Sequence, residues 1–314
     1  MKKLVKIAIL MLSFTLMLCG CQNKQNSYTE QTTQNITVSN PQEKNTNNIP
    51  ESTTPKANST EMHKEIIKTN DTSSSSEAVP TLKTGSNKRL SWSFVRKKDN
   101  LPPAFTKQYS ELADKYGAIY IGDTTKKTIY LTFDEGYENG YTPKILDALK
   151  DNNIKAAFFI TMPFLKNNSD LVERMLNEGH IVGNHTVHHP SLPEVSDQKV
   201  ESELVDLDLY FKEKTGISMK YMRAPKGEFS ERTLKISKDL GYTNVFWSFA
   251  YADWDIKKQK GADNAYNMVM NNIHNGAVLL LHAVSSDNAE AMDRIIKELK
   301  AQGYIFGTLD EFNK

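Results

Sequence analysis

The chain has 314 residues, of which 39% are hydrophobic and 25% charged, and its formal net charge is +1. This balance excludes the basic surface typical of a nucleic-acid-binding protein. Both cysteines, Cys19 and Cys21, lie near the N-terminus, so the rest of the chain offers neither a disulfide nor a cysteine metal site. Any metal bound there must use His, Asp or Glu.

Residues 1–20 have the pattern of a secretory signal peptide: three lysines, then an apolar run at residues 7–18. The ending Leu18-Cys19-Gly20-Cys21 resembles a bacterial lipobox, which implies cleavage after Gly20 and a lipid anchor on Cys21. An ordinary signal peptide and an uncleaved anchor are the alternatives. Cleavage would remove three lysines and no acid, changing the net charge from +1 to −2. We expect an extracytoplasmic lipoprotein of the cell membrane.

Residues 21–88 are rich in Ser, Thr, Asn and Gln, and Tyr28 is their only aromatic residue. Such a segment cannot bury enough apolar surface to offset the entropy lost on ordering. We predict a disordered tether here, followed by an ordered domain at residues 89–314.

Strands and helices alternate along the predicted domain. Helices are predicted at residues 105–116, 141–150, 169–177, 196–214, 230–240 and 288–301. Strands are predicted at residues 128–133, 156–160, 181–184, 221–223, 244–248, 277–282 and 304–306. This alternation predicts an α/β fold with a parallel sheet, either open or closed into a barrel. No glycine-rich phosphate-binding loop follows a strand, so we expect no nucleotide cofactor.

Acids and histidines follow two of these strands. Asp134 and Glu135 come directly after residues 128–133, although a solvated turn would explain them equally well on their own. His185 and His189 follow residues 181–184 at a spacing that lets both imidazoles bind one metal ion. Thr186 stands where a zinc-protease H-E-x-x-H motif has its Glu, which disfavours a protease.

Three further strand ends carry polar residues. Arg223 precedes a Pro-Lys-Gly turn and could hold a carboxylate in place. The alternative is an Arg that caps a chain segment or lies at the surface. Asp253 and Trp254 lie in an aromatic and acidic loop, and His282 ends an apolar strand, where it is well placed as a proton donor. The remaining histidines are interpreted as structural or solvated, without a catalytic role: His63, His180, His188 and His274.

Taken in order, five segments resemble the motifs of the polysaccharide deacetylase (NodB-homology, carbohydrate esterase 4) family. They are Thr132-Phe133-Asp134-Glu135-Gly136, His185-Thr186-Val187-His188-His189, Arg223-Ala224-Pro225-Lys226-Gly227, Asp253-Trp254 and Leu280-Leu281-His282. The resemblance covers residues 90–314. It implies a distorted (β/α) barrel with fewer than eight strands, and a divalent-metal enzyme that removes N-acetyl groups from a glycan.

The stretch Tyr137-Glu138-Asn139-Gly140-Tyr141-Thr142 further resembles the muramic δ-lactam branch of that family. Members of this branch de-N-acetylate N-acetylmuramic acid in peptidoglycan during spore cortex formation. The implied partner is therefore the peptidoglycan glycan strand. Two alternatives stay open, namely a peptidoglycan N-acetylglucosamine deacetylase and a catalytically inactive glycan-binding module on the same barrel.

The resemblance also implies roles for single residues in amide hydrolysis. Asp134 is the expected catalytic base, Arg223 its partner, and His282 the acid that protonates the leaving amine. The expected substrate contacts are Trp254, Leu280, Asp253 and Tyr137.

The same resemblance makes His185 and His189 metal ligands, with Thr186 holding their loop. Glu135 stands where most of the family has a metal-binding Asp. It either ligates the metal or turns away and leaves two histidines plus water. Zinc suits the histidine pair best, and Mn, Co and Mg are the alternatives.

Overall fold

The computed structural model describes residues 85–313. The predicted signal peptide, the lipidation site Cys21 and nearly all of the predicted tether lie outside the described residues. Ser86 N donates a 3.0 Å hydrogen bond to Glu231 Oε2, and Asn87 Nδ2 donates one of 3.0 Å to the Pro193 carbonyl. Contacts with the domain thus begin at residue 86, three residues before the predicted boundary at residue 89.

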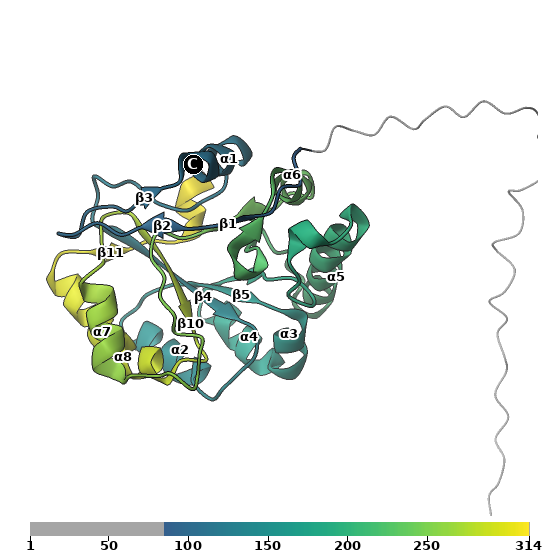
Figure 1. The fold of residues 1–314 in the computed structure, drawn as a ribbon. Helices are drawn as coiled ribbons and strands as arrows, with labels where there is room; N and C mark the ends of the chain where they lie inside the picture. Colours follow the sequence, from purple (N-terminus) through teal and green to yellow (C-terminus); the bar gives the residue numbers. More distant parts are fainter. Residues whose placement is uncertain (1–84, 314) are drawn as a thin grey trace, which may run out of the picture. The chain divides into compact units, whose positions relative to one another are not determined.

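A parallel sheet forms the centre of the domain (Figure 1). Its strands follow the spatial order β10 (Ala277–His282), β4 (Thr128–Glu135), β5 (Ala157–Ile160), β6 (Ile181–Asn184), β7 (Tyr221–Met222) and β9 (Thr243–Asn244). A further strand, β11 (Ile305–Phe306), pairs with the start of β4. Every residue of β4 is buried, as expected for a parallel strand that is covered on both faces.

Main-chain hydrogen bonds join the two edges of this sheet. Past β9, Val245 N donates to the Met222 carbonyl over 2.8 Å. Phe249 N then donates to the Val278 carbonyl over 3.2 Å, and the Phe249 carbonyl accepts from Leu280 N over 2.8 Å. The segment after β9 thus closes the sheet onto β10. This confirms the predicted distorted barrel with fewer than eight strands.

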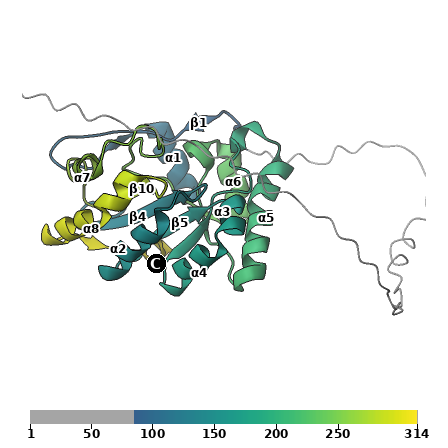
Figure 2. The ribbon, with the colours of Figure 1, turned by 90° about the horizontal axis from the view of Figure 1, so that it is seen from below.

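Helices connect the strands and pack outside the barrel. They are α1 (Lys107–Tyr116), α2 (Thr142–Asp151), α3 (Met162–Asn167), α4 (Ser169–Asn177), α5 (Asp197–Thr215), α6 (Glu231–Asp239), α7 (Ala262–Met270) and α8 (Ser286–Ala301). Figure 2 shows α8, α2, α4, α3 and α5 arranged around β10, β4 and β5. Ser196 caps α5 by accepting from Lys199 N, and Gly216 ends it in the left-handed conformation.

Short strands before the barrel close one side of it. β1 (Leu90–Ser91) pairs with β8 (Glu228–Phe229), and β2 (Phe94–Val95) pairs with β3 (Ala104–Phe105). Trp92 stacks on Phe246 at a centroid distance of 4.4 Å, and its Nε1 donates to the Trp247 carbonyl over 2.8 Å. The segment ahead of the barrel therefore braces the wall that carries Trp247.

Three 3₁₀ turns complete the described chain: Leu192–Glu194, Pro225–Gly227 and Leu309–Asn313. Within residues 85–313, no helix combines the length and the apolar character needed to span a membrane.

Candidate active site

A cavity of about 800 Å³ opens where β4, β6 and β10 end. Asp134, His185, His189 and His282 all line it, so one cavity contains four of the predicted site residues. The carboxyl ends of parallel strands meet at one edge of a barrel, which explains how residues far apart in sequence converge here. Tyr137, Trp254 and Leu280 also line the cavity, as predicted.

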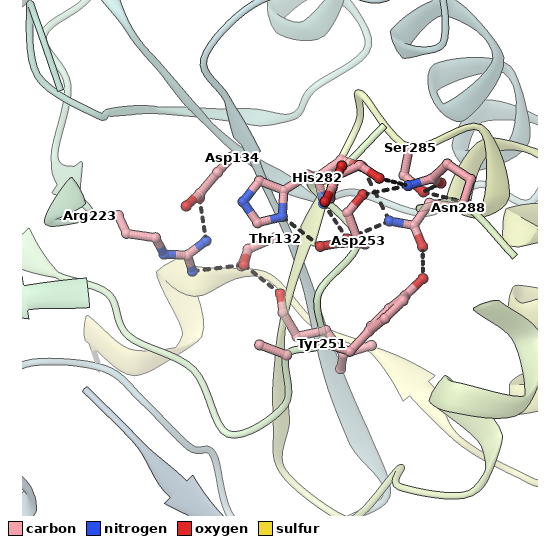
Figure 3. A network of polar contacts seen from close by, with 12 residues as sticks. Thr132, Asp134, Arg223, Tyr251, Asp253, His282, Ser285 and Asn288 are labelled. Atoms are coloured by element: carbon pink, nitrogen blue, oxygen red, sulfur yellow. Dashed lines mark hydrogen bonds and ion pairs between the residues drawn. The ribbon is translucent and has the colours of Figure 1, made fainter. Parts of the chain in front are cut away.

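Arg223 holds the carboxylate of Asp134 in a fixed orientation (Figure 3). Its Nη1 donates to Asp134 Oδ1 over 2.7 Å, and its Nη2 donates to Thr132 Oγ1 over 2.7 Å. A third bond of 2.9 Å runs from Nε to the Val245 carbonyl. The guanidinium is fully buried and contacts the Phe159 ring at 4.2 Å, so its fork has one available orientation.

The Arg223 pair also decides the protonation state of Asp134. Burial alone would raise the pKa of this carboxyl, but the charge of Arg223, aided by His185 and His282, outweighs burial and lowers the pKa. Asp134 is therefore ionised near neutral pH. Its Oδ2 lies 3.5 Å from His185 Nε2, which directs the second oxygen towards the histidine pair.

His282 lies beside Asp134, because the two residues are register partners across β10 and β4. Its Nδ1 donates to Asp253 Oδ1 over 2.8 Å, and its main-chain N donates to Oδ2 over 2.8 Å (Figure 3). Burial lowers the pKa of His282, but the Asp253 carboxylate more than compensates, and the pKa is raised. The imidazole is thus suited to carry a proton.

Asp253, predicted to bind substrate, is not among the residues that line the cavity, and its contacts are with the protein itself. It is 2% exposed, and Asn288 Nδ2 donates to its Oδ2 over 2.6 Å in addition to the two bonds from His282. Both carboxylate oxygens are therefore occupied by protein donors. Asp253 orients His282 and supports its charge.

His185 has the tautomer needed for a metal ligand. His185 Nδ1 lies 2.8 Å from the Arg223 carbonyl. Because a carbonyl only accepts, Nδ1 carries the hydrogen and Nε2 keeps its lone pair. The His189 ring lies 4.8 Å from the His185 ring, centroid to centroid. Burial lowers the pKa of both histidines, that of His189 to about 4, so both are neutral.

The loop carrying these histidines has an unusual backbone. Thr186 and His189 have φ angles of 72° and 57°, in a region that residues other than glycine seldom adopt. Thr186 Oγ1 accepts a 2.9 Å hydrogen bond from His189 N, and Thr186 N donates to Asn184 Oδ1 over 2.9 Å. Both of these hydrogen bonds lie within the histidine loop and help to hold its backbone.

Glu203 on α5 is a second support of this loop that the sequence reasoning missed. Its buried carboxylate accepts from His188 N over 2.7 Å and contacts His188 Nδ1 at 2.7 Å. Val187 N also donates to the Glu203 carbonyl over 3.1 Å. A signal was present, because Glu203 interrupts the apolar stripe of α5 between Val200 and Leu207.

Glu135 points away from the histidine pair. Side chains alternate along β4, and Glu135 is fully buried without a hydrogen bond to either carboxylate oxygen. The nearby Thr142 hydroxyl donates to Glu138 instead. Burial, followed by the charges of Glu138 and Asp134, raises the pKa of Glu135 well above its usual value. This arrangement is the predicted alternative in which Glu135 turns away from the metal.

With Glu135 turned aside, His185 and His189 are left as the two protein ligands of a metal site. Within residues 85–313, no three His, Cys, Asp or Glu side chains are grouped so that they could hold a metal ion. The two neutral imidazoles of His185 and His189 suit a divalent ion, whose other positions would be left to water or substrate oxygen atoms.

Two exposed aromatic residues flank the cavity. Tyr137 is 51% and Trp254 56% exposed, and the Trp254 ring lies 5.8 Å from the His282 ring. Aromatic rings that face solvent beside a catalytic cavity offer flat apolar surfaces to a sugar ring. Leu280, which is 6% exposed, adds an apolar wall next to His282.

Comparison with known proteins gives the site its context. Residues 121–245 match the family model described as polysaccharide deacetylase. The chain is 47% identical over 236 residues to peptidoglycan-N-acetylmuramic acid deacetylase PdaA of Bacillus subtilis, covering 75% of this chain and 88% of the relative. A peptidoglycan-N-acetylglucosamine deacetylase of Bacillus cereus is 35% identical over 200 residues, covering 62% and 72%.

A solved structure agrees with these sequence matches. The structure of Bacillus subtilis PdaA, described as a family 4 carbohydrate esterase, superimposes with a TM-score of 0.71. The match covers 73% of this chain and 98% of that one, at 47% sequence identity.

Proposed function

The chain belongs to the polysaccharide deacetylase family, and we propose that it is a metal-dependent hydrolase that removes the N-acetyl group of N-acetylmuramic acid in peptidoglycan. One observation carries this proposal. An ionised Asp134, held by Arg223, and a proton-carrying His282, held by Asp253, lie side by side across β4 and β10. A base and an acid next to two neutral histidines are the groups that amide hydrolysis requires.

Asp134 acts as the base in the first step. It accepts a proton from water as the water oxygen attacks the amide carbonyl carbon. Oδ2 suits this task, since Oδ1 is engaged by Arg223 while Oδ2 faces His185. Arg223 keeps the carboxylate ionised and prevents its rotation.

His282 acts as the acid in the second step. With Nδ1–H donated to Asp253, the Nε2 proton is available to the amide nitrogen. Protonation lets the C–N bond break, and the products are acetate and the free amine of the sugar. Leu280 and Trp254 supply the apolar wall for the acetyl methyl group.

Family members are metal-dependent, and we propose zinc for this chain, held by His185 and His189. When bound, the ion supplies Lewis-acid polarisation of the carbonyl and a lower pKa for the attacking water. The neutral state of both imidazoles, which burial enforces, supports this assignment.

We also propose where the enzyme works. A signal peptide at residues 1–20 and a lipid on Cys21 would tether the domain to the outer face of the cell membrane, next to the cell wall. There it would act on glycan strands as a step towards muramic δ-lactam in the spore cortex. The similarity to a peptidoglycan deacetylase supports a place of action outside the cell membrane, where peptidoglycan lies.

Acetate release by the purified domain tests the proposed activity. Oligosaccharides from digested peptidoglycan should lose acetate from N-acetylmuramic acid, and a chelator should stop the release until zinc is restored. Release from N-acetylglucosamine alone would instead support the rival deacetylase. No release from any peptidoglycan fragment would favour a glycan-binding module.

A further inference from the structure

The turn after β7 presents Lys226 to the cavity in a strained conformation. Lys226 has φ 60° and ψ 7°, a left-handed conformation that residues with a side chain seldom adopt. The turn is anchored on both sides. Pro225 and Gly227 are buried, and the Gly227 carbonyl accepts a 2.8 Å hydrogen bond from Trp92 N. A strained residue on a rigid turn at a cavity points to a function for its exposed side chain.

No carboxylate in the described part of the chain neutralises this side chain. Lys226 is the only Lys or Arg among the cavity-lining residues within 85–313, and its ammonium forms no ion pair or hydrogen bond with another described residue. Asp134 is the one carboxylate in the same wall, and Arg223 already pairs with it. The Lys226 ammonium therefore faces the cavity without a carboxylate partner among the described residues.

The other basic groups in the wall already have a partner or a proposed role. His185 and His189 are the residues proposed to hold the metal, and His282 is held by Asp253 as the proposed acid. The ring of His188 is engaged with the Glu203 carboxylate. Lys226 lines the same cavity as His185 and His189. An anionic group near the reacting amide would thus meet Lys226.

The proposed substrate has an anion at that place. N-acetylmuramic acid differs from N-acetylglucosamine by a lactyl ether on O3, whose carboxylate is negatively charged. Carbon 3 is bonded to carbon 2, which carries the acetamido group, so the carboxylate lies within a few bonds of the scissile amide. We propose that Lys226 binds the lactyl carboxylate and thereby selects N-acetylmuramic acid over N-acetylglucosamine. This inference rests on the proposed function.

A comparison of three oligosaccharides of equal length tests the inference: one with N-acetylmuramic acid, its lactyl methyl ester, and one with N-acetylglucosamine only. The ester removes the charge and keeps the sugar. Wild-type enzyme should prefer the acid over the ester by about fivefold in kcat/KM, mainly through KM, since a partly exposed ion pair contributes about 1 kcal/mol. High salt should reduce this preference.

Three variants complete the design. Lys226→Gln should bring the acid-to-ester ratio close to one, and Lys226→Arg should retain most of it. Lys238→Gln, which removes the same charge from an exposed position on α6, should keep the wild-type ratio. Thermal unfolding midpoints verify that each variant folds.

The outcomes separate two failures. A wild-type ratio of one, or a Lys226→Gln ratio equal to that of wild type, would overturn the role of Lys226 while leaving muramic deacetylation intact. Acetate release from the N-acetylglucosamine substrate alone would overturn the proposed function and this inference together. If Lys226→Gln does not fold, the Lys226→Arg ratio and the wild-type ratio remain, and a wild-type ratio of one still overturns the role of Lys226.

Discussion

Arg223 Nη1 lies 2.7 Å from Asp134 Oδ1, in a pair whose residues are 0% and 7% exposed. The guanidinium also binds Thr132, on the same strand β4 as Asp134, and the Val245 carbonyl just after β9, so three hydrogen bonds to two segments fix its orientation. Lysine would keep the charge but has no planar fork.

Arg223→Lys is therefore expected to lower kcat by about 10²-fold or more through misplacement of the Asp134 carboxylate. Steady-state kinetics on a muramic oligosaccharide measures this. Arg232→Lys is a matched control, because Arg232 is also buried and binds main-chain carbonyls, but lies outside the cavity. If the Arg223→Lys variant kept the kcat of the wild type, the planar guanidinium of Arg223 would not be needed.

Asp253→Asn should change the pH dependence of the reaction. The Asp253 carboxylate raises the pKa of His282 against the lowering effect of burial, so removal of its charge lowers that pKa. His282 must be protonated to act, and the alkaline limb of kcat/KM should move to lower pH, with a lower maximum. A pH profile from 5 to 10 measures it, in steps of about half a unit. An unmoved alkaline limb would mean that another group sets it.

Glu135→Gln is expected to stabilise the protein at neutral pH. Glu135 has a raised pKa in the folded state, so the folded protein keeps a proton that the unfolded chain releases above about 4.5. The free energy of unfolding then falls by up to about 1.4 kcal/mol per pH unit between the two pKa values. Gln removes this loss. Denaturant unfolding at pH 4 and pH 7 should show an advantage of the variant at pH 7 only.

The same variant tests the metal site. Glu135→Gln should retain the wild-type affinity for zinc, whereas His189→Ala should lose it. A marked loss of zinc affinity in Glu135→Gln would establish Glu135 as a ligand and contradict the orientation seen in the structure.

Much of the fold was predictable, because the apolar patterns and the helix-ending residues of the sequence agree with the tertiary structure. The predicted ranges 169–177, 181–184 and 277–282 coincide with α4, β6 and β10. Two helices were missed. α3 is only six residues long, and α7 has a mixed Asn- and Met-containing sequence that buries just Ala265 and Val269. Neither presents enough apolar periodicity to stand out.

The site residues that lie in sequence motifs were predictable. The roles of residues were less predictable where they depend on contacts between segments far apart in the sequence. Asp134, His185, His189, Arg223 and His282 meet as expected. Asp253 was expected to contact substrate from the family resemblance, but its pairing with His282 on β10 depends on how the barrel closes. The support from Glu203 likewise depends on how α5 packs against the histidine loop.

Glu203→Gln should loosen the histidine loop. The amide offers one acceptor oxygen in place of two, so it cannot serve both His188 N and His188 Nδ1 as the carboxylate does. Loss of such outer support typically lowers metal affinity by about 10- to 100-fold. Zinc titration by calorimetry measures it, with the exposed neighbour Glu201→Gln as control. Equal affinities in the two variants would remove Glu203 from this role.

Mass spectrometry of muropeptides before and after treatment tests the central claim most directly. With wild-type enzyme and zinc, we predict that N-acetylmuramic acid residues lose their acetyl groups while N-acetylglucosamine residues keep theirs. The isosteric Asp134→Asn variant, which lacks the base, should leave both sugars unchanged. Deacetylation confined to N-acetylglucosamine, or full activity in Asp134→Asn, would contradict the account.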